Sequence, residues 1–215
     1  LLGVMRDLVA DGNSVVVVDH DTRVLAETDY LIEMGPGAGA KGGQVIAQGT
    51  VPQVIDTRES RIAPFLAQGG NVHDRVRDNI DAHEIFSAGR IHMETDRLHT
   101  VGPLSVDIPR GRLTAVTGVS GSGKTTIIKH LTGILRQDSG EILFDGEPVY
   151  ENPALKAQIG FVPDDLSYFA PYTMKDAVKY YQSLYPVWDQ ERYDEMRKAF
   201  DLGSGKKDEQ LLKGD

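Results

Sequence analysis

The strongest chemical signal in this sequence is a glycine-rich segment that could hold a phosphate group. It matches the pattern G-x-x-x-x-G-K-[ST] in full and consists of Gly118, Val119, Ser120, Gly121, Ser122, Gly123, Lys124 and Thr125, with Thr126 next in line. Glycines let backbone N–H groups approach phosphate oxygens because no Cβ atom lies in the way. A helix starting at the end of such a loop adds its unpaired N–H groups and the positive end of its dipole.

Two side chains of this segment have expected roles. Lys124 should reach the β- and γ-phosphates of a nucleoside triphosphate, and the Thr125 hydroxyl should bind Mg²⁺. A glycine- and serine-rich turn could imitate the motif, but an apolar strand at residues 113–117 and a helical pattern at 124–135 flank it, as the motif requires. The segment therefore predicts binding of a nucleoside triphosphate and Mg²⁺.

The composition narrows the class of protein. The chain has 215 residues, a net charge of -9 and no cysteine. These values give no global attraction to nucleic acid and exclude disulfides and cysteine-based zinc sites, so no structural zinc is expected. No apolar run reaches the length of a membrane span, and the cytoplasm is the expected location. The first residues resemble the middle of a helix, which suggests a fragment.

The elements that must position the phosphate loop alternate between strands and helices. This alternation predicts an α/β fold with a mostly parallel sheet and flanking helices. Before the polar stretch 69–90, expected helices cover 1–11, 22–27 and, in two pieces, 51–66; expected strands cover 15–18, 30–34 and 44–47. After it, further strands are expected at 91–98, 104–108, 141–144 and 159–162, and a helical region interrupted at Pro186 at 173–200. The glycine-rich stretch 35–43 has no Lys-Thr pair and is expected to be a turn, not a second phosphate site.

Residues 1–126 resemble the UvrA-type ATPases, a DNA-repair and resistance family of ATP-binding cassette proteins. The matching segments are Val-Val-Val-Val-Asp-His-Asp at 15–21, Ile-Glu-Met-Gly-Pro-Gly-Ala-Gly at 32–39, Gly-Gly-Gln-Val-Ile-Ala-Gln-Gly-Thr at 42–50, and 114–124 up to Lys124. In that family the second segment lies at the end of a first cassette, and the next phosphate loop opens the second. The resemblance implies that 1–68 are the C-terminal part of a first cassette, 69–90 a linker, and 91–215 the N-terminal part of a second.

Residues 127–215 resemble the ATP-binding subunit of an ABC transporter instead. The matching segments are Leu-Thr-Gly-Ile-Leu at 131–135, Asp-Ser-Gly-Glu-Ile at 138–142, Asp-Gly at 145–146 and Ile-Gly-Phe-Val-Pro-Asp-Asp at 159–165. The zinc-bearing insertions of UvrA-type proteins would need cysteines. The two resemblances together indicate a P-loop NTPase of the ATP-binding cassette type that is a mosaic, natural or constructed, or a fragment.

Several expected parts of a complete cassette are not found in the sequence. No apolar run ends in the Asp-Glu of a Walker B strand, and the last residues, 211–215, lack the serine of the Leu-Ser-Gly-Gly-Gln signature. Asp164 stands where the family's Q-loop has glutamine, which puts a catalytic role there in doubt. The resemblance therefore implies an incomplete cassette that binds ATP and hydrolyses it only if the missing parts are supplied.

His20 is the candidate switch histidine of the resemblance, because it follows the apolar run 15–18 and precedes an acidic residue. In cassette ATPases this residue contacts the γ-phosphate. A simpler interpretation is a strand-end histidine that bonds to Asp19 or Asp21. His20 could act on the phosphate loop only if its strand packed beside Gly118, as in a permuted cassette.

The partners remain open at this level. The resemblance offers three partners besides ATP: a second cassette bound head to tail, a membrane transporter subunit, and DNA, which is the least favoured for this chain. For the function, an inert nucleotide-binding fragment stands as an alternative to a transporter subunit and to a UvrA-type DNA repair or resistance ATPase. An aromatic-rich stretch at 168–188 fits either a surface for a membrane partner or the core of a helical subdomain, and the second interpretation is favoured.

Overall fold

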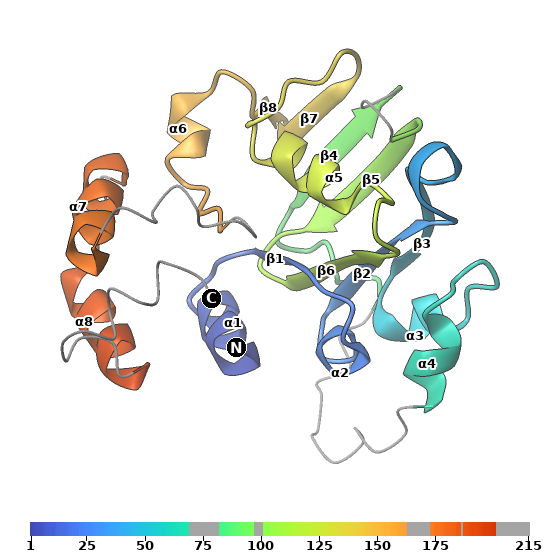
Figure 1. The fold of residues 1–215 in the computed structure, drawn as a ribbon, viewed down its shortest axis with the longest axis horizontal. Coiled ribbons are helices and arrows are strands. Elements are labelled where there is room, and N and C mark those ends of the chain that lie inside the picture. The colour runs from blue at the N-terminus through green and yellow to red at the C-terminus, as the bar shows by residue number, and fades with distance from the viewer. Residues whose placement is uncertain (69–81, 97–100, 163–172, 186, 201–215) are drawn as a thin grey trace. The chain divides into compact units, whose positions relative to one another are not determined.

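The computed structural model describes residues 1–68, 82–96, 101–162, 173–185 and 187–200 (Figure 1). The chain divides into two compact units, Leu1–Glu151 and Asn152–Asp215. The first unit holds all the strands of the described residues and the phosphate loop. Asp164 and the last residues, 201–215, lie outside the described part of the chain.

The phosphate loop belongs to a four-stranded sheet, sheet A, in the order β1-β6-β2-β3. Its strands are β1 (Val15–Val18), β6 (Leu113–Gly118), β2 (Tyr30–Gly35) and β3 (Gln44–Gly49). The pairs β1/β6 and β6/β2 are parallel, and β2/β3 is antiparallel. All six residues of β2 and the first five of β6 are buried, because both faces of a parallel sheet are covered. The α/β class predicted from the sequence is confirmed.

Sheet A joins strands from both sides of the expected linker at 69–90. Asp29 fixes the start of β2 against the start of β6: its N–H donates to the carbonyl of Leu113 (2.8 Å), and its carboxylate accepts from the Leu113 N–H (2.7 Å). Arg6 pairs with the other carboxylate oxygen at 2.7 Å. The Asp29 side chain is 7% exposed, so these bonds satisfy a carboxylate that would otherwise be buried without partners.

Helices cover sheet A on both sides. Figure 1 shows α1 (Leu2–Ala10), α2 (Thr22–Leu25), α3 (Val51–Ile55) and α4 (Ala63–Gln68) on one side and α5 (Lys124–Leu131) on the other. The core beneath α3 and α4 is made of buried aliphatic side chains: Leu25, Leu31, Ala47, Val51, Val54, Leu66 and Ala115. The expected helix at 51–66 is indeed in two pieces.

A second sheet, sheet B, is entirely antiparallel and was not anticipated as a separate layer. It has the order β5-β4-β7-β8, with β5 (Leu104–Pro109), β4 (Arg90–Thr95), β7 (Glu141–Phe144) and β8 (Glu147–Pro148). The parallel pairs of the described residues are therefore confined to sheet A.

Helix α5 ends at Leu131, four residues earlier than its apolar pattern suggested. Gly133 adopts a left-handed conformation (φ 64°). Its N–H donates to His130, and the N–H of Ile134 donates to Lys129, both at 2.9 Å. These two bonds form a Schellman motif, which satisfies the last carbonyls of a helix and stops it.

The second unit contains α6 (Pro153–Lys156), α7 (Met174–Leu184) and α8 (Gln190–Ala199). The strand expected at 159–162 is wrong, because these residues have no strand partner among those described. Instead, the Tyr185 hydroxyl donates to the carbonyl of Ile159 at 3.0 Å. No helix in the described ranges is long and apolar enough to cross a membrane.

The aromatic residues of the second unit contact one another without forming a closed core in the part that the structure describes. Tyr181 stacks on Tyr185 with ring centroids 6.2 Å apart, and Trp188 lies 5.3 Å from Tyr193. Ala177 is the buried residue of α7, and α8 has none. The described part of the 168–188 stretch therefore shows no packed aromatic core, and Tyr168, Phe169 and Tyr172 lie outside the described residues.

Candidate functional site

The phosphate loop connects the end of β6 to the start of α5, as the motif requires. Gly118, Gly121 and Gly123 have φ angles of 136°, 76° and 100°, which L side chains rarely adopt. A Cβ atom at Gly118 would lie 2.2 Å from the carbonyl oxygen of Met34. Glycine is thus needed at all three positions for the backbone conformation, and at Gly118 also for the close approach of β2.

The Lys124 side chain folds back over the loop. Its ammonium donates to the carbonyl oxygens of Gly118 (2.7 Å) and Val119 (2.9 Å). Burial lowers the pKa of this ammonium from its ordinary value, because desolvation disfavours the charged form of a cation. A bound phosphate would stabilise that charged form.

The first turn of α5 supplies further donors to the same place. The N–H groups of Lys124, Thr125 and Thr126 come too early in the helix to have intrahelical acceptors. Thr125 is exposed, and the Ser122 hydroxyl is buried without a hydrogen-bond partner among the described residues. Among the described residues, the N–H groups of the first helical turn, the partly buried Lys124 ammonium and the orphaned Ser122 hydroxyl fit a phosphate group, and the exposed Thr125 hydroxyl could reach a cation bound to it.

The strand that leads to His20 lies beside the strand that leads into this loop. Val18 pairs with Val116 in the parallel β1/β6 ladder, and the N–H of Asp19 donates to the Val116 carbonyl at 3.3 Å. β1 ends at Val18, two residues before His20, and β6 ends at Gly118, so both chain segments leave the same end of the sheet from neighbouring strands. The structure thus has the strand arrangement that a permuted cassette would require.

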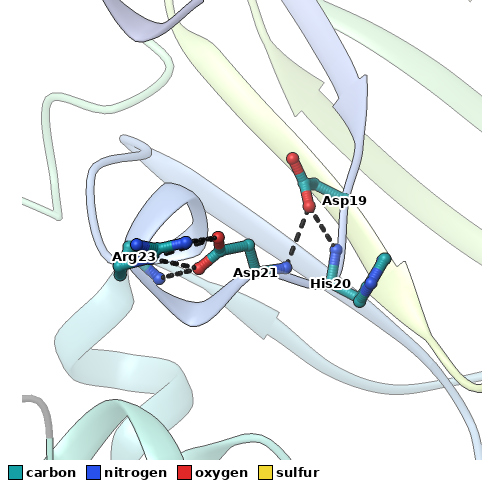
Figure 2. A network of polar contacts seen from close by, with 4 residues as sticks. All are labelled: Asp19, His20, Asp21 and Arg23. Carbon is teal, nitrogen blue, oxygen red and sulfur yellow. Dashed lines mark hydrogen bonds and ion pairs between the residues drawn. The ribbon is translucent and has the colours of Figure 1, made fainter.

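The backbone around His20 is held by two carboxylates (Figure 2). Asp19 accepts from the N–H groups of His20 (2.6 Å) and Asp21 (2.9 Å). Asp21 caps α2 by accepting from the Arg23 N–H (2.9 Å) and pairs with the Arg23 guanidinium (2.6 Å). The Arg23 bonds lower the pKa of Asp21 to about 2.

The His20 ring is exposed and points away from the Asp21–Arg23 pair in Figure 2. Asp19 bonds to backbone N–H groups, and the ring itself makes no hydrogen bond or ion pair with any residue that the structure describes. The simpler interpretation, a histidine whose ring is satisfied by Asp19 or Asp21, therefore lacks support.

Sequence reasoning missed one neighbour of the site. The glycine-rich turn at 35–43 packs directly against the phosphate loop, with backbone bonds to Gly121 and Ser122. Its glycine content could have signalled a close backbone approach, but the sequence does not say to which segment.

Comparisons with known proteins give two kinds of match. The ABC transporter family model matches residues 101–213, which include the whole phosphate loop and α5. The UvrABC system protein A of Deinococcus radiodurans is 40% identical over 131 residues, covering 60% of this chain and 12% of that protein. The proteins of the same name from Chlamydia trachomatis and Rickettsia conorii are 36% and 38% identical over 128 residues.

The match to the Chlamydia trachomatis protein covers 60% of this chain and 7% of that protein, and the match to the Rickettsia conorii protein covers 59% of this chain and 12% of that protein. It therefore spans a small part of the relatives that it resembles. The family match covers more than half of the chain and falls on the strand, loop and helix whose geometry fits a phosphate. The chain belongs to the ABC transporter family, as an ABC-type nucleotide-binding ATPase domain that resembles the UvrABC system protein A.

Proposed function

We propose that the chain binds Mg²⁺–ATP through the phosphate loop at 118–126. The observation that carries this proposal is the position of Lys124, whose ammonium lies over the loop and donates to two backbone carbonyls of the loop itself. The β- and γ-phosphates of ATP would replace these carbonyls as acceptors. Charge-assisted bonds of this kind are about twice as strong as neutral ones.

The Mg²⁺ ion is proposed to bind the Thr125 hydroxyl together with phosphate oxygens and water. Mg²⁺ in phosphate sites keeps several waters and takes few protein ligands. Thr125 lies at the start of α5 and is exposed, which suits a hydroxyl that shares a hydrated ion with the nucleotide.

His20 is proposed to sense the γ-phosphate. Its support is the parallel pairing of β1 with β6, since His20 follows β1 by two residues at the end of the sheet where β6 enters the phosphate loop, and its exposed ring. A histidine at this place could donate a hydrogen bond to the terminal phosphate of ATP, which ADP lacks.

Hydrolysis is proposed only where further groups complete the site. In-line attack by water needs a residue that positions the nucleophile, and the sequence has no apolar run that ends in Asp-Glu. A second cassette bound head to tail is the proposed source of contacts on the open side of the phosphate loop.

Calorimetric titration of Mg²⁺–ATP into the wild-type chain and Lys124→Ala tests the proposal. We expect saturable binding by the wild type and a loss of at least tenfold in affinity for the variant. Lys179→Ala, which removes an exposed lysine from α7, is the matched control and should bind like the wild type. Folded wild-type protein that binds no ATP, or equal binding by Lys124→Ala, would refute the proposed site.

The relatives favour a second, wider proposal, a role in a UvrA-type protein acting on DNA. The support is identity of up to 40% with proteins named UvrABC system protein A. Binding to duplex DNA, measured at about 50 and 200 mM salt, should weaken steeply with salt if phosphates are contacted. The net charge of -9 makes a local contact surface necessary, and absence of binding even at low salt would favour a transporter subunit instead.

A further inference from the structure

The turn at residues 35–43, here called the buttress loop, is bonded to the phosphate loop through its backbone. The N–H of Gly39 donates to the carbonyl of Gly121 (3.2 Å), and the N–H of Gly43 donates to the carbonyl of Ser122 (3.1 Å). The Gly43 carbonyl in turn accepts from the Gly102 N–H (2.8 Å). Gly43 therefore ties the phosphate loop to the segment that leads into β5.

The contact is too close for side chains. A Cβ atom at Gly42 would lie 2.4 Å from the Gly37 carbonyl oxygen and 3.3 Å from the Ser122 Cα atom. A Cβ atom at Gly121 would lie 3.2 Å from the Cβ atom of Ala38. Gly42 has φ −105°, which any residue can adopt, so glycine is needed there for space alone. This packing explains why residue 42 is a glycine although its φ angle does not require one.

These two bonds also set the direction of N–H groups in the phosphate loop. In a planar trans peptide the C=O of one residue and the N–H of the next point in opposite directions. Because the Ser122 carbonyl is held by the buttress loop, the Gly123 N–H must point away from that loop. Likewise, because the Gly121 carbonyl points to the buttress loop, the Ser122 N–H points away from it and donates to the Val119 carbonyl at 3.2 Å.

We propose that the buttress loop is a positioning element for nucleotide binding: it holds the phosphate loop in the shape whose N–H groups face a phosphate. This inference rests on the proposed function of the phosphate loop and adds a segment that itself contacts no nucleotide. Preorganised donors lower the cost of binding, because they need no reordering when the anion arrives. Nucleotide binding must then also stiffen residues 35–43.

Two measurements test this inference. The first compares Mg²⁺–ATP affinity of the wild type, Gly42→Ala and Gly3→Ala. Each variant adds one methyl group, but a Cβ atom at Gly3 meets nothing within 4 Å. We expect Gly42→Ala to bind at least tenfold more weakly and Gly3→Ala to bind within twofold of the wild type.

The second measurement is amide hydrogen exchange of the peptides that cover 35–43 and 118–124. In the wild type we expect Mg²⁺–ATP to slow exchange in both peptides, and in Lys124→Ala in neither. A purely structural turn would not respond to the nucleotide. This readout uses the wild-type fold and still decides the matter if Gly42→Ala does not fold.

The outcomes separate this inference from the proposed function. Wild-type binding of ATP with unchanged exchange at 35–43, or with full affinity in Gly42→Ala, overturns the positioning role and leaves the ATP site standing. A folded wild type that binds no ATP refutes the ATP site and with it the positioning role. Faster exchange at 118–124 in nucleotide-free Gly42→Ala, together with the affinity loss, supports the inference.

Discussion

Val18 on β1 lies opposite Val116 on β6 in a parallel strand pair. The strand that leads to His20 precedes the phosphate loop in the chain, yet it is the immediate neighbour of the strand that feeds the loop. On its other edge β6 pairs with β2, where Met34 lies opposite Gly118. Both sides of the phosphate loop's strand are therefore supplied by residues 1–68.

Deleting residues 1–68 should abolish both cooperative folding of the first unit and ATP binding. The deletion removes β1 and β2, which are the two partners of β6, and exposes both of its edges. Leu113, Ala115 and Val116, which are 0% exposed in the whole chain, would face water. Thermal unfolding followed by circular dichroism and a nucleotide titration would measure this.

Adding residues 1–68 back as a separate peptide is the matched control, and it should restore binding at least in part. A truncated chain that melts cooperatively and binds Mg²⁺–ATP with unchanged affinity would contradict the arrangement of sheet A. It would favour a second cassette that is independent of the first.

His20→Ala should weaken the binding of ATP about tenfold while changing that of ADP less than twofold. A tenfold loss corresponds to about 1.4 kcal/mol, which is in the range of one hydrogen bond to a charged group. Competitive titrations with both nucleotides would measure the ratio. His83→Ala, which alters an exposed histidine, should leave both affinities unchanged. Equal losses for ATP and ADP would rule out contact with the γ-phosphate.

Ser60→Ala should lower the free energy of unfolding by about 1–3 kcal/mol, because it removes a donor from a buried carboxylate. The Ser60 hydroxyl donates to Glu33 at 2.6 Å, and the Arg61 N–H donates to the same carboxylate at 3.0 Å. Glu33 is 1% exposed. Urea unfolding would measure the change, with the exposed Ser105→Ala expected to cost less than about 0.5 kcal/mol. Equal effects of the two variants would show that Glu33 does not depend on this donor.

The phosphate loop could be predicted from its residues because its chemistry is local. The run from Gly118 to Thr126 contains the turn, the cation and the helix start. These parts are adjacent in the sequence, so their order along the chain can be read without knowing the rest of the fold. The contacts of Gly42 and Gly43 could not be predicted in the same way. A glycine indicates that another backbone segment can approach it closely. Which segment does so depends on packing between parts that are far apart in the chain, and the sequence around Gly42 and Gly43 does not show this.

The mistaken element boundaries have similar physical causes. Ile134 and Leu135 continue the apolar pattern of α5, yet Gly133 takes a left-handed conformation and the Schellman bonds end the helix first. The apolar run at 159–162 has the composition of a strand but no ladder partner among the described residues. Strand propensity alone does not form a strand, because each backbone donor and acceptor needs a neighbour.

His92 and Asp107 should make the stability of sheet B depend on pH. His92 Nδ1 lies 2.7 Å from Asp107, whose other carboxylate oxygen pairs with Arg90 at 2.9 Å, and Glu94 lies 3.6 Å from Nε2. The hydrogen bond to Asp107 raises the pKa of His92 above its ordinary value of 6.5. A raised pKa in the folded state means that the fold favours protonated His92.

The stabilisation by this pair should therefore be fully present below pH 6.5 and should be lost as the pH rises through the raised pKa of folded His92. Both side chains are partly exposed, so the effect should stay below about 1 kcal/mol. Urea unfolding between pH 6 and 8.5 would show a declining free energy of unfolding in the wild type and a flatter profile in Asp107→Asn. Asp145→Asn removes a carboxylate that pairs with Arg110 instead and should keep the wild-type slope. A slope that survives in Asp107→Asn would assign the pH dependence to another group.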